Sequence, residues 1–176
     1  MARFSVVLDA CVLYPAPLRD ALMRLATTDL FKAHWTDDIH EEWIRNVASN
    51  IGIKRETLDR VRELMDMHAP DAKVVGYENL IEGLILPDQN DRHVLAAAIK
   101  CNADAIVTMN LKDFPKLILD TYNIELIHPD DFIIYQLDIN PALCCKAFRD
   151  QRTALKNPPL TVDEFLANLQ KQQLPQ

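Results

Sequence analysis

The clearest structural pattern in the sequence lies in residues 86–115, LPDQNDRHVLAAAIKCNADAIVTMNLKDFP. Residues 86–91 have the composition of a loop, and the apolar spacing that follows predicts a helix over 92–101. Residues 105–108 then form a short run typical of a buried strand, and 110–115 is a second loop at the end of that strand. Because the helix is rich in alanine, it can lie close to a sheet. The stretch therefore predicts a helix that leads into a strand of a parallel sheet.

Further short strands and helices lie on both sides of this unit. Residues 4–8 predict a buried parallel strand that ends at Asp9, and residues 125–127 predict another. Helices are expected from the Pro15–Pro17 region through Leu25, from the N-cap Thr36 onward, and over 54–68, with a weak strand or an extended link at 73–77. Leu58, Val61, Leu64 and Met65 are expected to face inward. Strands that alternate with helices predict an α/β three-layer sandwich with a central parallel sheet.

The last part of the chain carries no strand pattern. Helices are expected over 129–137 and 141–155, and the capping-box sequence Thr161-Val-Asp-Glu164 predicts the start of a final helix over Phe165, Leu166 and Leu169. We therefore expect a domain over residues 1–128 and a C-terminal helical extension over 129–176 that packs on it.

Composition and charge limit the class of protein. The chain has 176 residues, 19 of them basic and 26 acidic, for a net charge of −7. This balance excludes a simple basic nucleic-acid coat, because nonspecific affinity comes from lysine and arginine that neutralise phosphates. The four cysteines show no C-x-x-C spacing, and no signal peptide or membrane segment is visible, so we expect reduced thiols in a cytoplasmic protein.

Acidic residues stand where the predicted elements meet. Asp9 follows the first strand, Asp113 lies just past another strand, and Asp91 opens the alanine-rich helix. Ligands of parallel sheets gather at the carboxyl ends of the strands, so these side chains can converge in space. Two like charges at about 4 Å repel by about 4 kcal/mol at an effective dielectric near 20, so such a cluster needs a cation. Oxygen ligands favour Mg²⁺ or Mn²⁺.

Two segments resemble a known family. The opening Val7-Leu-Asp9-Ala-Cys-Val-Leu-Tyr14-Pro resembles the start of PIN domains, and the blocks 86–98 and 104–115 resemble their second half. The resemblance covers residues 4 to about 128, and the remaining helices resemble the tail of some bacterial toxins of the VapC class. It implies a PIN-like fold and a nuclease that binds a divalent metal through acidic residues and hydrolyses phosphodiester bonds, usually of RNA.

The resemblance also implies the site residues. Asp9 matches the first acidic position and Asp91 the third; Glu42, which precedes Trp43, fits the second better than Glu41. Asn110 stands where many members of the family have aspartate, so Asp113 is the natural substitute as the fourth ligand. Further residues are expected to support these ligands: Asp88, Thr108, Asn110 and, less directly, Asn46.

Several residues have plainer interpretations. His93 is expected on the surface of its helix, and Lys54, Arg55, Arg60 and Arg62 on a solvated face rather than on phosphates. A phosphotransferase that uses Asp9 as nucleophile would need a second aspartate where the chain has Cys11. A non-catalytic PIN-like module that binds RNA or protein remains the alternative function.

The function expected from the resemblance is a Mg²⁺- or Mn²⁺-dependent endoribonuclease, the toxin of a type II toxin–antitoxin pair. Its substrate is RNA, and a protein antitoxin is its expected partner; a homodimer also remains open. We expect the antitoxin to place an arginine or lysine among Asp9, Glu42 and Asp91. An apolar stretch of it would pack against the helices around Trp43 or on the C-terminal extension.

Overall fold

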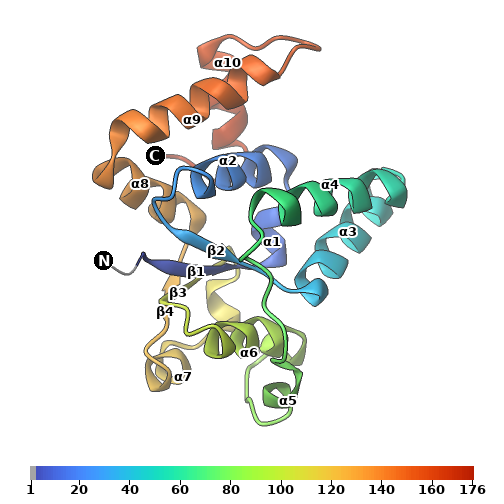
Figure 1. The fold of residues 1–176 in the computed structure, drawn as a ribbon, viewed down its shortest axis with the longest axis vertical. Coiled ribbons are helices and arrows are strands. Elements are labelled where there is room, and N and C mark those ends of the chain that lie inside the picture. Colours follow the sequence, from blue (N-terminus) through green and yellow to red (C-terminus); the bar gives the residue numbers. More distant parts are fainter. Residues whose placement is uncertain (1–2) are drawn as a thin grey trace.

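The computed structural model describes residues 3–176 and contains a four-stranded sheet at its centre. All three strand pairs are parallel, and the strands lie in the order β2-β1-β3-β4. The strands are β1 (Ser5–Leu8), β2 (Lys32–His34), β3 (Ala105–Val107) and β4 (Glu125–Ile127). Helices lie above and below this sheet in Figure 1, which confirms the predicted α/β sandwich with a central parallel sheet.

The helices differ widely in length. The longer ones are α2 (Ala16–Ala26), α3 (Asp37–Ile51), α4 (Arg55–His68), α6 (Arg92–Lys100), α8 (Pro129–Ile139), α9 (Pro141–Ala154) and α10 (Val162–Gln170). The short ones are α1 (Ala10–Leu13), α5 (Glu78–Ile81) and α7 (Lys116–Thr121), and η1 (Gln89–Asp91) and η2 (Leu111–Asp113) are single 3₁₀ turns. Within residues 3–176, no helix combines the length and the apolar character needed to span a bilayer.

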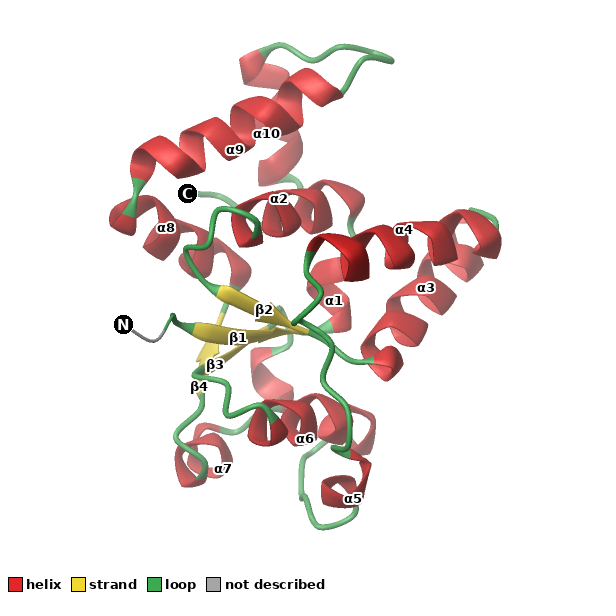
Figure 2. Cartoon of the chain, in the orientation of Figure 1, coloured by secondary structure: helices red, strands yellow, loops and turns green. Residues whose placement is uncertain are grey.

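The alanine-rich helix packs directly on the sheet. Helix α6 contacts both β1 and β3, and its residues from Val94 to Ala98 are buried. Small side chains allow this close approach, as the sequence predicted. In Figure 2, α6 and α7 lie on one side of the strands, and α2 and α8 lie on the other. Asp9 and Thr108, which follow the carboxyl ends of β1 and β3, are both buried.

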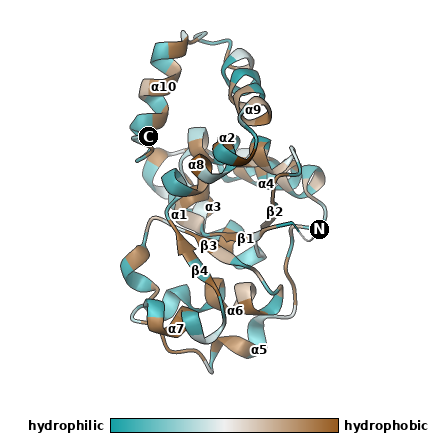
Figure 3. Cartoon of the chain, turned by 90° about the vertical axis from the view of Figure 1, so that its left-hand side faces the viewer, coloured by the Kyte–Doolittle hydropathy of each residue, from teal (hydrophilic) through white to brown (hydrophobic). Residues whose placement is uncertain are grey.

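The C-terminal helices continue the second layer. Helix α9 packs along α2, and the side-chain amide of Gln151 donates to the carbonyl of Pro17 at 2.8 Å. Helix α10 begins with the predicted capping box, in which Thr161 and Glu164 bond to each other's backbone amides. Figure 3 shows α9 and α10 banded in hydrophobic and hydrophilic colours, as expected of helices with one face packed and one face open.

Some local predictions were wrong. Strand β2 was not predicted, because Lys32–His34 is only three residues long and buries a single apolar side chain, Ala33. The short helices α1 and α5 were also missed. Leu64, which was expected to face inward, is 45% exposed. The link at 73–77 forms only one bridge, between Trp35 and Lys73. All four cysteines are free, as predicted.

The cap of α3 offers a test of how this helix is held. Thr36 is fully buried, and its hydroxyl oxygen accepts a hydrogen bond from the backbone amide of Ile39 at 3.1 Å. Thr36→Ala is expected to lower the free energy of unfolding by about 1 kcal/mol, because the amide loses its partner. Urea denaturation measures this. Thr153→Ala, an exposed threonine inside α9, is the control and should change stability much less; equal effects would contradict the cap's role.

Candidate active site

Asp9 lies at the carboxyl end of β1, where the chain turns into α1. Its backbone amide still bonds to the carbonyl of Val107 in β3, and its side-chain Oδ1 accepts from the amide of Ala10 at 2.7 Å. The carboxylate is 2% exposed. Burial raises its pKa, against the opposing effect of its hydrogen bonds. This carboxylate is therefore fixed in direction but poorly solvated.

Two side chains hold the second oxygen of Asp9. The hydroxyl of Thr108, just past β3, donates to Oδ2 at 2.7 Å, and the thiol of Cys11 donates to the same atom at 3.3 Å. Backbone amides support both donors: Asn110 donates to the Thr108 oxygen at 3.0 Å and Met109 to the Cys11 sulfur at 3.3 Å. Burial and the charge of Asp9 raise the pKa of Cys11 to about 12, so the thiol stays protonated and acts as a donor.

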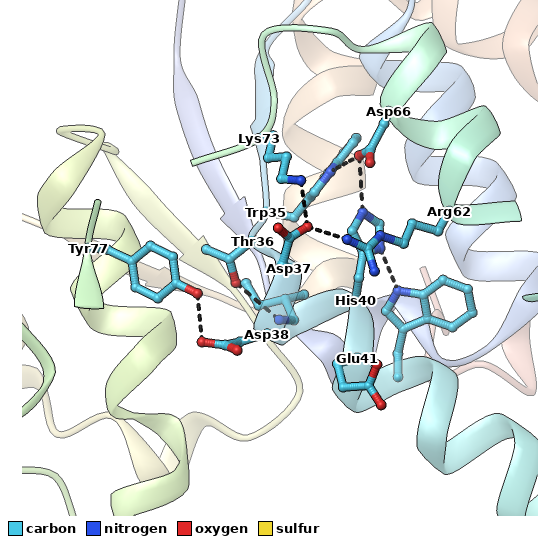
Figure 4. A network of polar contacts seen from close by, with 12 residues as sticks. Trp35, Thr36, Asp37, Asp38, His40, Glu41, Arg62, Asp66, Lys73 and Tyr77 are labelled. Atoms are coloured by element: carbon cyan, nitrogen blue, oxygen red, sulfur yellow. Dashed lines mark hydrogen bonds and ion pairs between the residues drawn. The ribbon is translucent and has the colours of Figure 1, made fainter. Parts of the chain in front are cut away.

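A buried polar network fixes the rotation of α3 (Figure 4). His40 is fully buried; its Nδ1 accepts from the indole of Trp43 at 3.0 Å. The proton of the neutral ring must then lie on Nε2, which donates to Asp66 of α4 at 3.2 Å. Asp66 also accepts from the indole of Trp35 at 2.8 Å. Burial lowers the pKa of His40, so the ring is neutral, and Glu42 projects from a helix whose register is set by this network.

Glu41 and Glu42 have different partners. Glu41 forms a two-point ion pair with Arg55 of α4, with 2.7 Å between Nη1 and Oε1, and lies apart from the network in Figure 4. Glu42 contacts His93 of α6, with 3.3 Å between Oε2 and Nε2. Burial lowers the pKa of His93, but the hydrogen bond and charge of Glu42, together with the charges of Asp38 and Asp9, raise it overall. Glu42 is therefore directed towards α6, and Glu41 is directed towards α4.

Asp91 is a buried carboxylate among like charges. It is 9% exposed, its side chain makes no capping bond to α6, and its Oδ2 atom is buried without a hydrogen-bond partner among residues 3–176. Burial and the charges of four other carboxylates together raise its pKa to about 7: Asp9, Asp88, Asp113 and Glu42. Acidic residues far apart in sequence therefore act electrostatically on Asp91.

The remaining predicted residues lie at the edge of this group. Asp113 ends the 3₁₀ turn η2 and is half-buried, whereas Asn110 is exposed and contributes its backbone amide to Thr108. Asp88 is exposed and caps η1 by accepting from the amide of Asn90 at 2.8 Å. The negative charge of Asp113 acts on Asp91 and helps to raise its pKa.

Two contacts were not expected from the sequence. Cys11 bonds to Asp9, and His93, expected on the helix surface, is only 14% exposed and contacts Glu42. Each lies two residues after a candidate carboxylate, which is the signal that could have pointed to it. Of the basic residues on α4, Arg55 pairs with Glu41 and Asp59, and Arg62 pairs with Asp37, so both are neutralised by the protein itself.

The arrangement and the donor atoms of the carboxylates bear on whether they can bind a divalent cation. In the chain from residue 3 to residue 176, no three histidine, cysteine, aspartate or glutamate side chains are already arranged as a metal-binding group. The donor chemistry nevertheless fits a hard cation, because all the gathered groups offer carboxylate oxygens and one of these oxygens is buried without a partner. An ion would also remove the repulsion that raises the pKa of Asp91.

Comparisons with known proteins agree with this architecture. Residues 5–112 match the PIN domain family, and residues 129–176 match the family described as VapC50 C-terminal domain. A segment of 97 residues is 41% identical to "Putative ribonuclease VapC50" of Mycobacterium tuberculosis (strain ATCC 25618 / H37Rv). That alignment covers 55% of this chain and 57% of the relative, so the chain spans little more than half of it. No solved structure gives a significant match. Since the PIN match extends over most of the chain, the protein belongs to the PIN-domain family.

Proposed function

We propose that this protein is a Mg²⁺- or Mn²⁺-dependent endoribonuclease and the toxin of a type II toxin–antitoxin pair. The observation that carries the proposal is the buried, unpartnered Oδ2 of Asp91 among four other carboxylates at the ends of the strands. A protein gains nothing in stability from such a group, which makes it a candidate functional site. The name of the relative, a ribonuclease of the VapC type, supports RNA as the substrate.

In this proposal Asp9, Glu42, Asp91 and Asp113 hold the ion. When bound, the ion would lower the pKa of a water molecule and stabilise the charge that develops on the phosphate and the leaving oxygen. Thr108 and Cys11 donate to Oδ2, which favours the ionised form of the Asp9 carboxylate and fixes its direction. None of the carboxylates forms a covalent intermediate, and the protonated Cys11 thiol is not a nucleophile.

We place the chemistry in residues 1–128 and assign residues 129–176 to partner contacts. Trp43 itself is fully buried and offers no side-chain surface, so of the two expected packing surfaces we propose the C-terminal extension. The C-terminal helices instead offer a cavity of about 460 Å³, lined by apolar side chains such as Ile133, Phe148 and Leu166. An apolar antitoxin segment fits this chemistry, while a basic side chain of the antitoxin would compete with the ion among the carboxylates.

The enzyme assignment is tested by metal dependence. Purified protein is treated with EDTA, dialysed, and supplied with Mg²⁺, Mn²⁺ or Ca²⁺ before a labelled RNA is added. We expect cleavage to be lost with EDTA and restored by Mg²⁺ or Mn²⁺. RNA binding without cleavage under every condition would instead support the non-catalytic PIN-like binding module.

The toxin assignment is tested separately. Expression alone is expected to arrest growth, and co-expression with the adjacent open reading frame is expected to restore growth and to yield a complex in a pull-down. Harmless expression combined with cleavage of RNA by the purified protein, and no binding by the neighbour, would remove the toxin role and keep the nuclease.

A further inference from the structure

We propose that His93 is a positioning residue that holds the Glu42 carboxylate through one oxygen and leaves the other for the metal ion. This inference rests on the proposed function and concerns how the Glu42 carboxylate is oriented. The imidazole Nε2 lies 3.3 Å from Oε2 of Glu42 and joins α6 to α3 across 51 residues of sequence. Oε1 of Glu42 has no hydrogen-bond partner among the described residues.

The four candidate ligands are not held equally. Asp9 receives two side-chain donors and one backbone amide, from Thr108, Cys11 and Ala10. Within residues 3–176, Glu42 receives a donor only from His93, and Asp91 has a buried oxygen without a hydrogen-bond partner. His93 therefore has the same relation to Glu42 as Thr108 has to Asp9.

The surroundings of His93 limit its role. Its side chain is 14% exposed, and its Nδ1 atom is buried without a hydrogen-bond partner. A histidine on a solvated helix face would have water at both nitrogens. Because Nε2 is already engaged by Glu42 and Nδ1 is enclosed, neither nitrogen is open to an incoming substrate. The ring acts through Glu42.

Long side chains need such support to be effective ligands. Glu42 is 33% exposed and has three rotatable side-chain bonds, so an unsupported carboxylate would lose conformational entropy on binding the ion. Hydrogen bonds to ligands from surrounding side chains typically account for 10- to 100-fold in metal affinity or activity. We expect an effect of about this size from the removal of His93.

The test measures Mn²⁺ binding by calorimetry on the full-length, metal-free protein, together with cleavage of a labelled RNA. The variants are His93→Leu, His93→Gln and Glu42→Ala, and the double variant of Glu42→Ala with His93→Leu. His68→Leu serves as the matched control, because His68 is an exposed histidine near the end of α4. Thermal unfolding of each variant is recorded, so that a loss of folding is recognised.

His93→Leu is expected to weaken Mn²⁺ binding about 10- to 100-fold and to lower kcat at subsaturating Mn²⁺. His93→Gln keeps an N–H donor, so its Mn²⁺ affinity should remain within about threefold of that of the unchanged protein. Once Glu42 is alanine, His93→Leu should add almost nothing, because the two residues act as one unit.

Three outcomes would overturn the inference: unchanged Mn²⁺ affinity in folded His93→Leu, equal loss in both His93 variants, or a full additional loss in the Glu42→Ala background. If Glu42→Ala weakens Mn²⁺ binding and His93→Leu does not, only the role of His93 fails. If the unchanged protein binds no Mn²⁺, the proposed metal-dependent function fails with it.

Discussion

Asp91→Asn is expected to lower the rate of RNA cleavage by about 100-fold or more while the protein stays folded. Asp91 is the carboxylate on which the charges of Asp9, Asp88, Asp113 and Glu42 all act. The amide has nearly the same shape but carries no charge, so it removes an anionic ligand without creating a cavity. The loss of a charged contact in the transition state typically costs 10²- to 10³-fold. Initial rates on a labelled RNA at saturating Mn²⁺ measure this effect.

The matched control for Asp91→Asn is Asp88→Asn. Asp88 lies three residues earlier, is exposed, and caps the 3₁₀ turn η1, a role that asparagine can also fill. We expect Asp88→Asn to lower activity by no more than about tenfold. Asp88 supports the site rather than binding the ion, and the loss of a supporting residue typically costs at least about tenfold only when its hydrogen bond to a ligand is removed. Full activity in Asp91→Asn would reject the assignment of Asp91.

Asp91→Asn should also stabilise the metal-free protein, and this effect should depend on pH. The folded pKa of Asp91 is about 7 against an ordinary value of 3.8, so the folded state binds the proton more tightly than the unfolded state. Its contribution therefore destabilises the fold as pH rises from about 4 to 7, by at most about 1.4 kcal/mol per pH unit. Above pH 7 the penalty is complete. Asp91→Asn removes it.

This prediction is best measured as a difference between two proteins. Burial lowers the pKa of both His34 and His40, so these histidines reduce stability as pH falls below about 6.5 and oppose the effect of Asp91. Urea denaturation of the unchanged protein and of Asp91→Asn, both in EDTA, cancels the histidine contribution. The variant should be more stable at pH 8, and its advantage should shrink towards pH 4. An advantage that is constant with pH would contradict the raised pKa of Asp91.

Addition of Mn²⁺ should narrow the difference in stability between the two proteins at pH 8. A ligand that binds only the folded state at 100 times its Kd contributes about 2.7 kcal/mol, which raises Tm by about 5–10 °C in a chain of this size. The unchanged protein should show this rise and Asp91→Asn should show much less. A Tm of the unchanged protein that is indifferent to millimolar Mn²⁺ would count against a functional metal site.

The sequence predicted the fold best where local pattern and packing agree. The strand at Ala105–Val107 and the helix over Arg92–Lys100 have apolar spacing that matches their burial in the core. Strand β2 has no such pattern: it exists because Lys32–His34 pairs with β1, a tertiary contact that a three-residue run cannot encode. Leu166 in α10 is 51% exposed and lines the cavity between the C-terminal helices, an arrangement that local spacing does not encode.

The candidate site was predictable in its residue types and not in its contacts. The position of Asp9 and Asp91 next to predicted strand and helix ends follows from local sequence. The choice between Glu41 and Glu42 depends on partners 14 and 51 residues away, Arg55 and His93, and only the folded chain shows which glutamate each one meets. The same holds for Cys11, whose hydrogen bond to Asp9 depends on how α1 turns back on the strand end.

The proposed function requires that Asp9 and the other candidate carboxylates support metal-dependent RNA cleavage. The most direct test compares Asp9→Asn with Asp29→Asn in one assay, on the same labelled RNA with Mn²⁺ present. Asp29 is a surface carboxylate that pairs with Arg3, so its amide variant controls for the loss of one negative charge. Cleavage should fall by about 100-fold or more in Asp9→Asn and remain unchanged in Asp29→Asn. Equal cleavage by the two variants would contradict the assignment of the site.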